Sequence, residues 1–207
     1  PWFNLWGQST GALFSTLVNR RRRHLKISCS GEGLNVEAAI YCIWHEDLIH
    51  LFVAMPHLNQ PQIWMNHPMW YMKPVHVFLG HMGITELALG STGHGGQAAL
   101  EHLADRLNAS GASTTIAVDG PSGPPYQLRK GCLYLAQKTG LPIIPLRFEC
   151  SNEIRYPFNW DRKRSPRPGS QLNIVFGAPI RLKPDCVIDD FVSPLVTALG
   201  PTGSPTH

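Results

Sequence analysis

The stretch Ile43-Trp44-His45-Glu46-Asp47, residues 43–47, decides the fold, because a buried strand passes there directly into a helix. Residues 38–44 form a short and nearly continuous apolar run, which is typical of a parallel strand buried on both faces. Residues 46–55 then show helical spacing. The junction predicts an α/β domain and places His45 at the carboxyl end of a central strand.

The same alternation of strand-like and helix-like segments extends outward in both directions. Further strands are expected at residues 24–30, 62–66, 87–89, 114–118, 143–148 and 172–176, and further helices at residues 72–82, 99–107 and 128–136. We therefore predict one α/β domain over residues 24–199, with a largely parallel mixed sheet flanked by helices. Ligands of such sheets gather at the carboxyl ends of strands. This rule directs attention to His45 and to residues 66–67, 90–96 and 119–124.

The two ends of the chain differ from this domain. Residues 1–23 join a segment rich in tryptophan, leucine and phenylalanine to the run Arg20-Arg21-Arg22-Arg23. The apolar positions fit either an interfacial amphipathic helix or a helix packed into the core. The arginines fit an anionic partner, a solvated turn or the entry to a strand. The sequence has no run of about 20 apolar residues, so we predict no transmembrane helix. Residues 200–207 are predicted to be disordered.

Composition limits the classes of function. The hydrophobic share of 43% and the charged share of 15% indicate a globular protein, and the net charge of +4 suits an anionic partner without requiring one. The five cysteines form no Cys-x-x-Cys pair, and neither they nor the 10 histidines show the spacing of metal ligands. We therefore predict a reducing compartment and no metal site. Basic residues do not alternate with aromatic ones as a nucleic-acid platform requires.

His45 is the first candidate for chemistry. A histidine near its ordinary pKa can remove a proton from an alcohol at neutral pH. Glu46 or Asp47 could fix the tautomer of the ring, although neighbours in sequence do not face each other on a helix. The alternative is a histidine at a helix start, where the two acidic residues merely favour the positive end of the helix dipole.

A glycine-rich segment at residues 90–96, Gly-Ser-Thr-Gly-His-Gly-Gly, follows one strand and opens a helix. Its backbone N–H groups could face an anion. The segment also contains Gly93-x-Gly95-x-x-Ala98, a relaxed dinucleotide-binding pattern, and Asp119 follows at about the distance of a ribose-binding acid. This coincidence makes an NAD(P)-dependent oxidoreductase the alternative function.

The stretch at residues 119–125, Asp-Gly-Pro-Ser-Gly-Pro-Pro, predicts a rigid loop without regular structure. Such a loop would hold the Asp119 carboxylate in place. Lys130 is expected one turn into the following helix, from which it could reach an anion. The alternative is a tight connection between a strand and a helix.

In this order, the segments resemble the lysophospholipid acyltransferase superfamily, and within it the bacterial lipid A acyltransferase-like branch of unknown function. The similar stretches fall between residues 38 and 182, at residues 43–45, 70–74, 89–96, 118–124, 130–131, 141–145 and 159–162. The resemblance implies a glycerol-3-phosphate acyltransferase-like fold. It also implies transfer of a fatty acyl group from a thioester, carried on CoA or on acyl carrier protein, to a hydroxyl of a lysophospholipid or another lipid acceptor.

The resemblance further implies roles for single residues. His45 matches the family's base, but the position of the family's partner aspartate holds His50, so Glu46 or Asp47 would have to substitute, or His45 would work unassisted. Two arginines that bind acceptor phosphate in the family are missing, which makes glycerol 3-phosphate a poor acceptor. The implied acceptor-binding residues are Gly90, Ser91, His94, Gly95, Asp119, Gly120 and Lys130.

The resemblance implies no cofactor besides the thioester co-substrate. It also implies a peripheral or monotopic protein at the cytoplasmic face of the inner (plasma) membrane. Because the sequence places no nucleophile beside a base, we expect direct transfer without a covalent enzyme intermediate. The missing aspartate and arginines leave a further alternative, a non-catalytic lipid-binding protein on the same fold.

Overall fold

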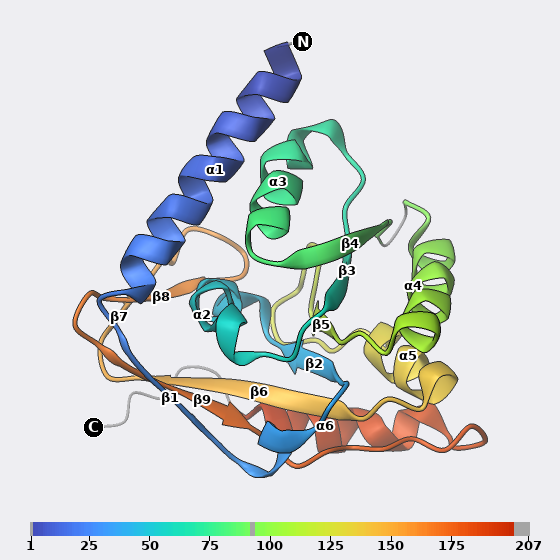
Figure 1. Ribbon diagram of the computed structural model, residues 1–207. Coiled ribbons are helices and arrows are strands. Elements are labelled where there is room, and N and C mark those ends of the chain that lie inside the picture. Colours follow the sequence, from blue (N-terminus) through green and yellow to red (C-terminus); the bar gives the residue numbers. More distant parts are fainter. Residues whose placement is uncertain (1, 92–93, 201–207) are drawn as a thin grey trace.

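A five-stranded sheet forms the centre of the computed structural model, which describes residues 2–91 and 94–200 apart from the side chain of Phe3 (Figure 1). The strands lie in the order β1-β9-β6-β2-β5. Their bounds are β1 Lys26–Ser30, β2 Ile40–Ile43, β5 Thr114–Ala117, β6 Ile143–Cys150 and β9 Gln171–Phe176. All neighbouring strands are parallel except β6 and β9, which confirms the predicted mixed and largely parallel sheet.

A second parallel pair, β3 (Gln62–Asn66) and β4 (Ile84–Leu89), continues beside β5. A parallel bridge between Gln62 and Ser113 joins this pair to the main sheet, and the N–H of Ile63 donates to the Ser113 carbonyl at 3.0 Å. The strands β2, β5, β3 and β4 therefore run in the same direction, and their carboxyl ends open on one side of the molecule.

The central strand β2 is buried on both faces, as its apolar run predicted. Tyr41 and Ile43 point into one core, which helices α2 (Leu48–Ala54) and α3 (Lys73–His81) complete. Ile40 and Cys42 point into a second core on the other face. That core is completed by helices α4 Gly96–Ser110, α5 Gly131–Thr139 and α6 Val192–Leu199.

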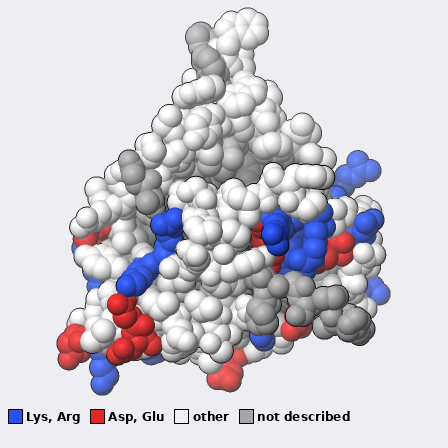
Figure 2. Space-filling model, turned by 180° about the vertical axis from the view of Figure 1, so that it is seen from behind, with Lys and Arg blue, Asp and Glu red and all other residues white. Residues whose placement is uncertain are grey.

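The first helix, α1 (Trp2–Arg22), lies against α3 and reaches past the rest of the molecule (Figure 1). Glycines permit the close contact, because a Cβ added to Gly11 would lie 2.7 Å from the carbonyl oxygen of Pro74. The outward face is apolar and exposed at Trp2, Leu5, Trp6, Leu13, Phe14 and Leu17. In Figure 2 the narrow upper part of the molecule shows no lysine, arginine or acidic side chain. None of the helices described is both long and apolar enough to span a membrane.

Several boundaries differ from the sequence-based expectation. Arginines 20–22 form the last turn of α1 instead of a separate turn or a strand entry, so their charge faces the negative end of the helix dipole. Helix α5 begins at Gly131, so Lys130 precedes the helix instead of lying one turn inside it. The hairpin of β7 (Glu153–Arg155) and β8 (Arg164–Pro166) was not expected, because strands of three residues are too short to show a period.

The remaining elements are single 3₁₀ turns at η1 Glu32–Asn35, η2 His45–Asp47, η3 Met55–His57, η4 Trp70–Met72 and η5 Ile188–Phe191. The turn η2 directly follows β2 and carries the first candidate site residues. Of the segment predicted to be disordered, residues 201–207 lie outside the described part of the chain.

Candidate functional site

The register of two neighbouring strands brings His45 and Asp119 together. In the parallel pair of β2 and β5, Ile43 lies opposite Ala117, and each candidate follows its strand by two residues. The N–H of Val118 donates to the Ile43 carbonyl at 2.9 Å, which extends the ladder past both strand ends. Two side chains 74 positions apart in sequence therefore meet at the same sheet edge.

The Asp119 carboxylate is buried and fully engaged. The backbone N–H groups of His45 and Tyr126 donate to its two oxygens at 2.9 and 3.0 Å. The Nδ1 atom of the His45 ring lies 3.6 Å from Asp119 Oδ1, which is beyond hydrogen-bond distance but close enough for an ion pair when the ring is protonated. Burial alone would raise the pKa of Asp119, but the contact with His45 and the two backbone donors outweigh it and lower this pKa.

The His45 ring is partly exposed, with 19% of its side chain accessible to solvent. Only 1% of the Asp119 side chain is accessible. Gly120 lies against the ring edge, since an added Cβ would stand 2.8 Å from Nδ1 and closer still to Cε1. The Trp160 ring packs at 5.0 Å between ring centroids. These neighbours restrict the orientation of the ring.

A second pair arises in the same way on the neighbouring strands. In the parallel pair of β3 and β4, Asn66 lies opposite Leu89, and the N–H of Gly90 donates to the Asn66 carbonyl at 2.8 Å. His67 and Ser91 follow directly. Ser91 Oγ lies 2.6 Å from His67 Nδ1, and Tyr71 Oη lies 3.0 Å from His67 Nε2.

This pair corrects the expectation that the chain offers no nucleophile beside a base. Ser91 and His67 are 24 positions apart, and no sequence motif joins them. The signal was present in the strand ends, because both residues follow parallel strands that the sequence predicted as separate elements. The pairing of β3 with β4 could not be predicted from the sequence.

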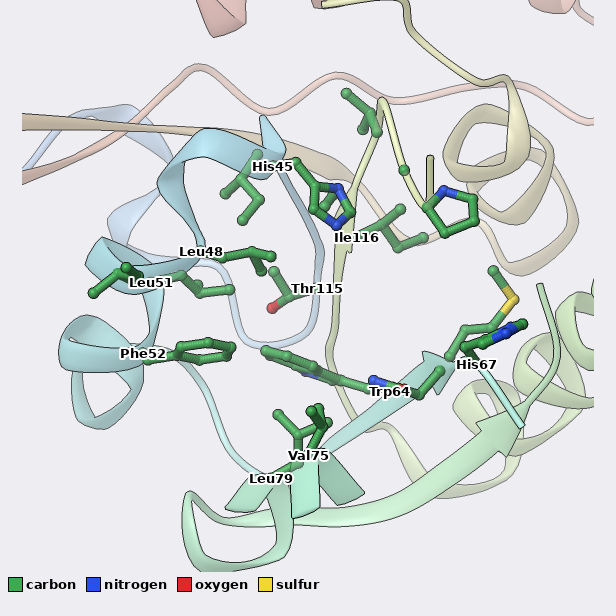
Figure 3. A pocket seen from close by; sticks show the side chains of 18 of the residues that line it. His45, Leu48, Leu51, Phe52, Trp64, His67, Val75, Leu79, Thr115 and Ile116 are labelled. Atoms are coloured by element: carbon green, nitrogen blue, oxygen red, sulfur yellow. The ribbon is translucent and has the colours of Figure 1, made fainter. Parts of the chain in front are cut away.

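His45 of the first pair and both residues of the second pair line one large apolar cavity of about 1650 Å³. Figure 3 shows the rings of His45 and His67 at this cavity, together with apolar side chains from four surrounding elements. The apolar part of the wall includes Leu48, Leu51, Phe52, Trp64, Val75 and Leu79. Phe14, Leu17 and Val18 of α1 also line it, so the first helix contributes to the cavity. A space of this size and lining suits a long hydrocarbon chain.

The carboxylates of Glu46 and Asp47 lie apart from the His45 ring, in a buried cluster around Arg164. Tyr126 Oη donates to Glu46 at 2.9 Å, and Arg164 Nε lies 3.4 Å from Glu46 and donates to Asp47 at 3.1 Å. Arg164 also reaches Glu153 of β7 at 3.4 Å. Burial raises the pKa of Glu46 despite these cationic neighbours. Both acids therefore bind the β7–β8 hairpin to the end of β2.

His50, which stands where the resemblance implied an aspartate, is fully buried and faces the same cluster. Its Nδ1 lies 3.7 Å from Asp47, and its Nε2 lies 3.5 Å from Glu153. Burial lowers the pKa of His50 to about 3, and the positive charge of Arg164 acts in the same direction. The ring is therefore neutral at ordinary pH.

One group among the described residues has the composition of a metal site. Ligand atoms of His50, Cys150 and Glu153 lie within 4.8 Å of one another, although their sequence spacing does not show it. The Arg164 guanidinium contacts the same Glu153 oxygen that faces His50. A fixed positive charge at that oxygen disfavours a metal cation there.

The other predicted binding residues lie around the two pairs. Gly90 and Ser91 are buried at the cavity, while His94 and Gly95 are exposed, with the His94 ring 4.9 Å from that of His67. Lys130 lines the cavity but forms an ion pair with Asp189 at 2.5 Å.

The dinucleotide alternative finds little support around Asp119. Both of its carboxylate oxygens accept backbone N–H groups, and only 1% of the residue is exposed, so a ribose has no access to the carboxylate. Gly93, the first glycine of the dinucleotide pattern, lies outside the described residues.

A comparison with known proteins identifies a solved structure of similar fold. No protein family model matches the chain, and no curated protein matches its sequence. Among solved structures, the chain is similar to the crystal structure of the 1-acyl-sn-glycerophosphate acyltransferase PlsC from Thermotoga maritima, with a TM-score of 0.52. The match covers 95% of this chain and 80% of that one at 13% sequence identity. The chain therefore has an acyltransferase-like fold, as expected.

Proposed function

We propose that the chain is an O-acyltransferase that moves a fatty acyl group from an acyl thioester, on CoA or acyl carrier protein, to a hydroxyl of a lysophospholipid or another lipid acceptor. One observation carries the proposal: the His45 ring, with the Asp119 carboxylate 3.6 Å from Nδ1, lines an apolar cavity of about 1650 Å³. A base and a site for a hydrocarbon chain thus share one space.

The geometry supports a division of roles within the pair. A proton on His45 Nδ1 faces the Asp119 carboxylate, so Nε2 is left as the acceptor for the proton of a lipid hydroxyl. The hydroxyl oxygen then attacks the thioester carbonyl, and the thiol leaves with the proton. Asp119 stays ionised because its pKa is lowered, and it stabilises the imidazolium during the transfer.

The residues implied as acceptor-binding support a lipid acceptor without a tight phosphate site. Gly120 lies against the His45 ring, and Gly90, Ser91, Arg129 and Lys130 line the same cavity. The Arg129 guanidinium donates to the Gly123 carbonyl at 2.7 Å, and Lys130 binds Asp189. Each cation thus has one partner within the chain, and neither lies in a closed phosphate pocket, which favours recognition of the acceptor mainly through its acyl chain.

The outward face of α1 supports a membrane surface as the place of the reaction. Its exposed tryptophan, leucine and phenylalanine side chains match an interfacial helix, and the arginines at its end match anionic headgroups. We propose peripheral binding at the cytoplasmic face of the inner membrane.

Replacing His45 by alanine tests the proposed base. We expect the rate of acyl transfer to a lysophospholipid to fall by about 10² to 10⁴. The release of the thiol from acyl-CoA measures this rate. The matched control is His57→Ala, at an exposed histidine of η3, which should keep the wild-type rate. Near wild-type turnover by a His45→Ala protein with an unchanged melting temperature would contradict the proposal.

A further inference from the structure

We propose that Ser91 and His67 form a second reactive pair, in which Ser91 Oγ attacks the carbonyl carbon of a fatty acyl ester and the chain acts as an esterase. The two side chains lie 2.6 Å apart and line the apolar cavity. The inference rests on this contact and on the cavity, and it does not require the proposed transfer by His45.

The contacts of His67 suit a general base. With the proton on Nε2, that atom donates to the Tyr71 hydroxyl oxygen at 3.0 Å, and Nδ1 accepts the proton of Ser91 Oγ. The His76 ring donates from Nε2 to the main-chain carbonyl of His67 at 3.0 Å and so holds the backbone of this residue. A hydroxyl, a base and a group that orients the base are the parts that serine nucleophiles require.

The glycines around Ser91 bring a helix start close to it. A Cβ added to Gly96 would stand 2.8 Å from the Ser91 carbonyl carbon, and one added to Gly90 would stand 2.7 Å from the Gly95 oxygen. Gly96 is the first residue of the 15-residue helix α4, and it lines the cavity together with Gln97. First-turn N–H groups lack partners within a helix, so they can stabilise an oxyanion beside Ser91.

The proposed reaction balances with water as the second reactant. Ser91 Oγ forms a bond to the acyl carbon, its proton passes to His67 Nδ1, and the ester C–O bond breaks as the alcohol leaves with that proton. Water then gives a proton to Nδ1 and attacks the acyl carbon, the bond to Ser91 Oγ breaks, and the serine takes the proton back. The products are a fatty acid and an alcohol.

An alkyl fluorophosphonate, which labels nucleophilic serines irreversibly, tests the inference. We expect intact mass and peptide mapping to place one adduct on Ser91 in the wild-type chain. His67→Ala should be labelled about 100-fold more slowly, because it has lost its base. Hydrolysis of p-nitrophenyl octanoate should fall in the same proportion.

Two controls separate the outcomes. Ser28→Ala, at an exposed serine of β1, should label like the wild type, and Ser91→Ala should not label. His45→Ala should still be labelled at Ser91, so a loss of acyl transfer in that variant leaves the esterase inference standing. Conversely, a wild-type protein that transfers acyl groups but is not labelled at Ser91 overturns the esterase alone.

A conservative variant keeps the test valid if Ser91→Ala fails to fold. Ser91→Cys retains a nucleophile of similar size, and we expect a covalent octanoyl adduct at position 91 with p-nitrophenyl octanoate. A folded Ser91→Cys protein without that adduct, or a wild-type protein labelled only at another residue, overturns the inference.

Discussion

At the scale of single residues, the candidate site requires a glycine at position 120, beside the His45 ring. The His45 ring lies between the Asp119 carboxylate, Gly120 and the Trp160 ring. Any Cβ at position 120 would collide with the ring, so glycine is required there by close packing. The orientation of the base is thus sensitive to a change of one methyl group.

Gly120→Ala should lower acyl transfer strongly, because the added methyl group would displace the His45 ring from Asp119. We expect a fall of about 100-fold or more in kcat/KM, since misplacing a catalytic group by 1 Å can cost this much. Gly131→Ala is the matched control, because a Cβ at this first residue of α5 meets nothing within 4 Å. Equal activity of the two variants would contradict this view of Gly120.

His50 gives the stability a pH dependence with a defined sign. Its pKa is about 3 in the folded chain and 6.5 ordinarily, so the unfolded chain binds the extra proton between these values. Stability conferred by the neutral ring is therefore complete above about pH 6.5 and declines as the pH falls, by up to about 1.4 kcal/mol per pH unit.

The comparison of wild type with His50→Phe isolates this contribution, because phenylalanine keeps the stacking on Phe148. We expect denaturant unfolding to show that the stability of wild type relative to the variant decreases from pH 7 to pH 5. A difference that stays constant over this range would show that the His50 ring is not held neutral.

The positions of the candidate residues after strands could be predicted from the sequence, but their partners could not. His45 and Asp119 follow predicted strands, and the structure brings them together. Glu46 and Asp47 were considered as partners of His45 because they are adjacent in sequence, yet their side chains point to Arg164. Sequence adjacency could not reveal this, because Arg164 is 117 positions from Asp47 and lies on a strand too short to predict.

At the scale of elements, the β7–β8 hairpin is tied to the end of β2 by charge instead of apolar packing. Arg164 of β8 contacts Glu46 and Asp47 of η2 and Glu153 of β7. Three carboxylates converge on one guanidinium, and 12% of that side chain is exposed. Removing the cation would leave these buried carboxylates either unpaired or forced to take up protons, and both cost stability.

Arg164→Met should therefore destabilise the fold by about 3–5 kcal/mol, which is the usual cost of breaking a buried ion pair on one side. Arg106→Met is the control, since its pair with Glu86 is exposed and should contribute at most about 1 kcal/mol. Urea unfolding of both variants measures the difference. Similar losses from the two would mean that the buried cluster contributes no more than a surface pair.

At the scale of the whole molecule, the fold could be predicted from periodicity, whereas the cavity could not. The buried strand β2 and the alternation around it correctly gave an α/β sheet with helices on both faces. The cavity is built by side chains of α1, α2, α3, β3 and β5, and no local pattern shows which faces of separate elements enclose a space. The sequence left open whether α1 packs or stays exposed, and the helix does both, with glycines inward and large apolar residues outward.

Placing a charge on the outer face of α1 tests membrane binding of the whole chain. Leu13→Glu should weaken binding to anionic phospholipid vesicles by about tenfold or more, because burying a leucine contributes about 1.5–3 kcal/mol. Gln8→Glu adds the same charge at an exposed polar position of the helix and should bind nearly as well as wild type. Sedimentation with vesicles measures both, and an unaffected Leu13→Glu protein would contradict the proposed interfacial role.

The packing of α1 has a consequence for how a substrate enters. Phe14 and Leu17 are exposed on this helix and also line the cavity that holds His45. If the helix lies in the headgroup region as proposed, a fatty chain can slide sideways from the bilayer past these two side chains. The hydrocarbon then never crosses water, and entry avoids the free energy of hydrating it, about 0.8 kcal/mol for each methylene group.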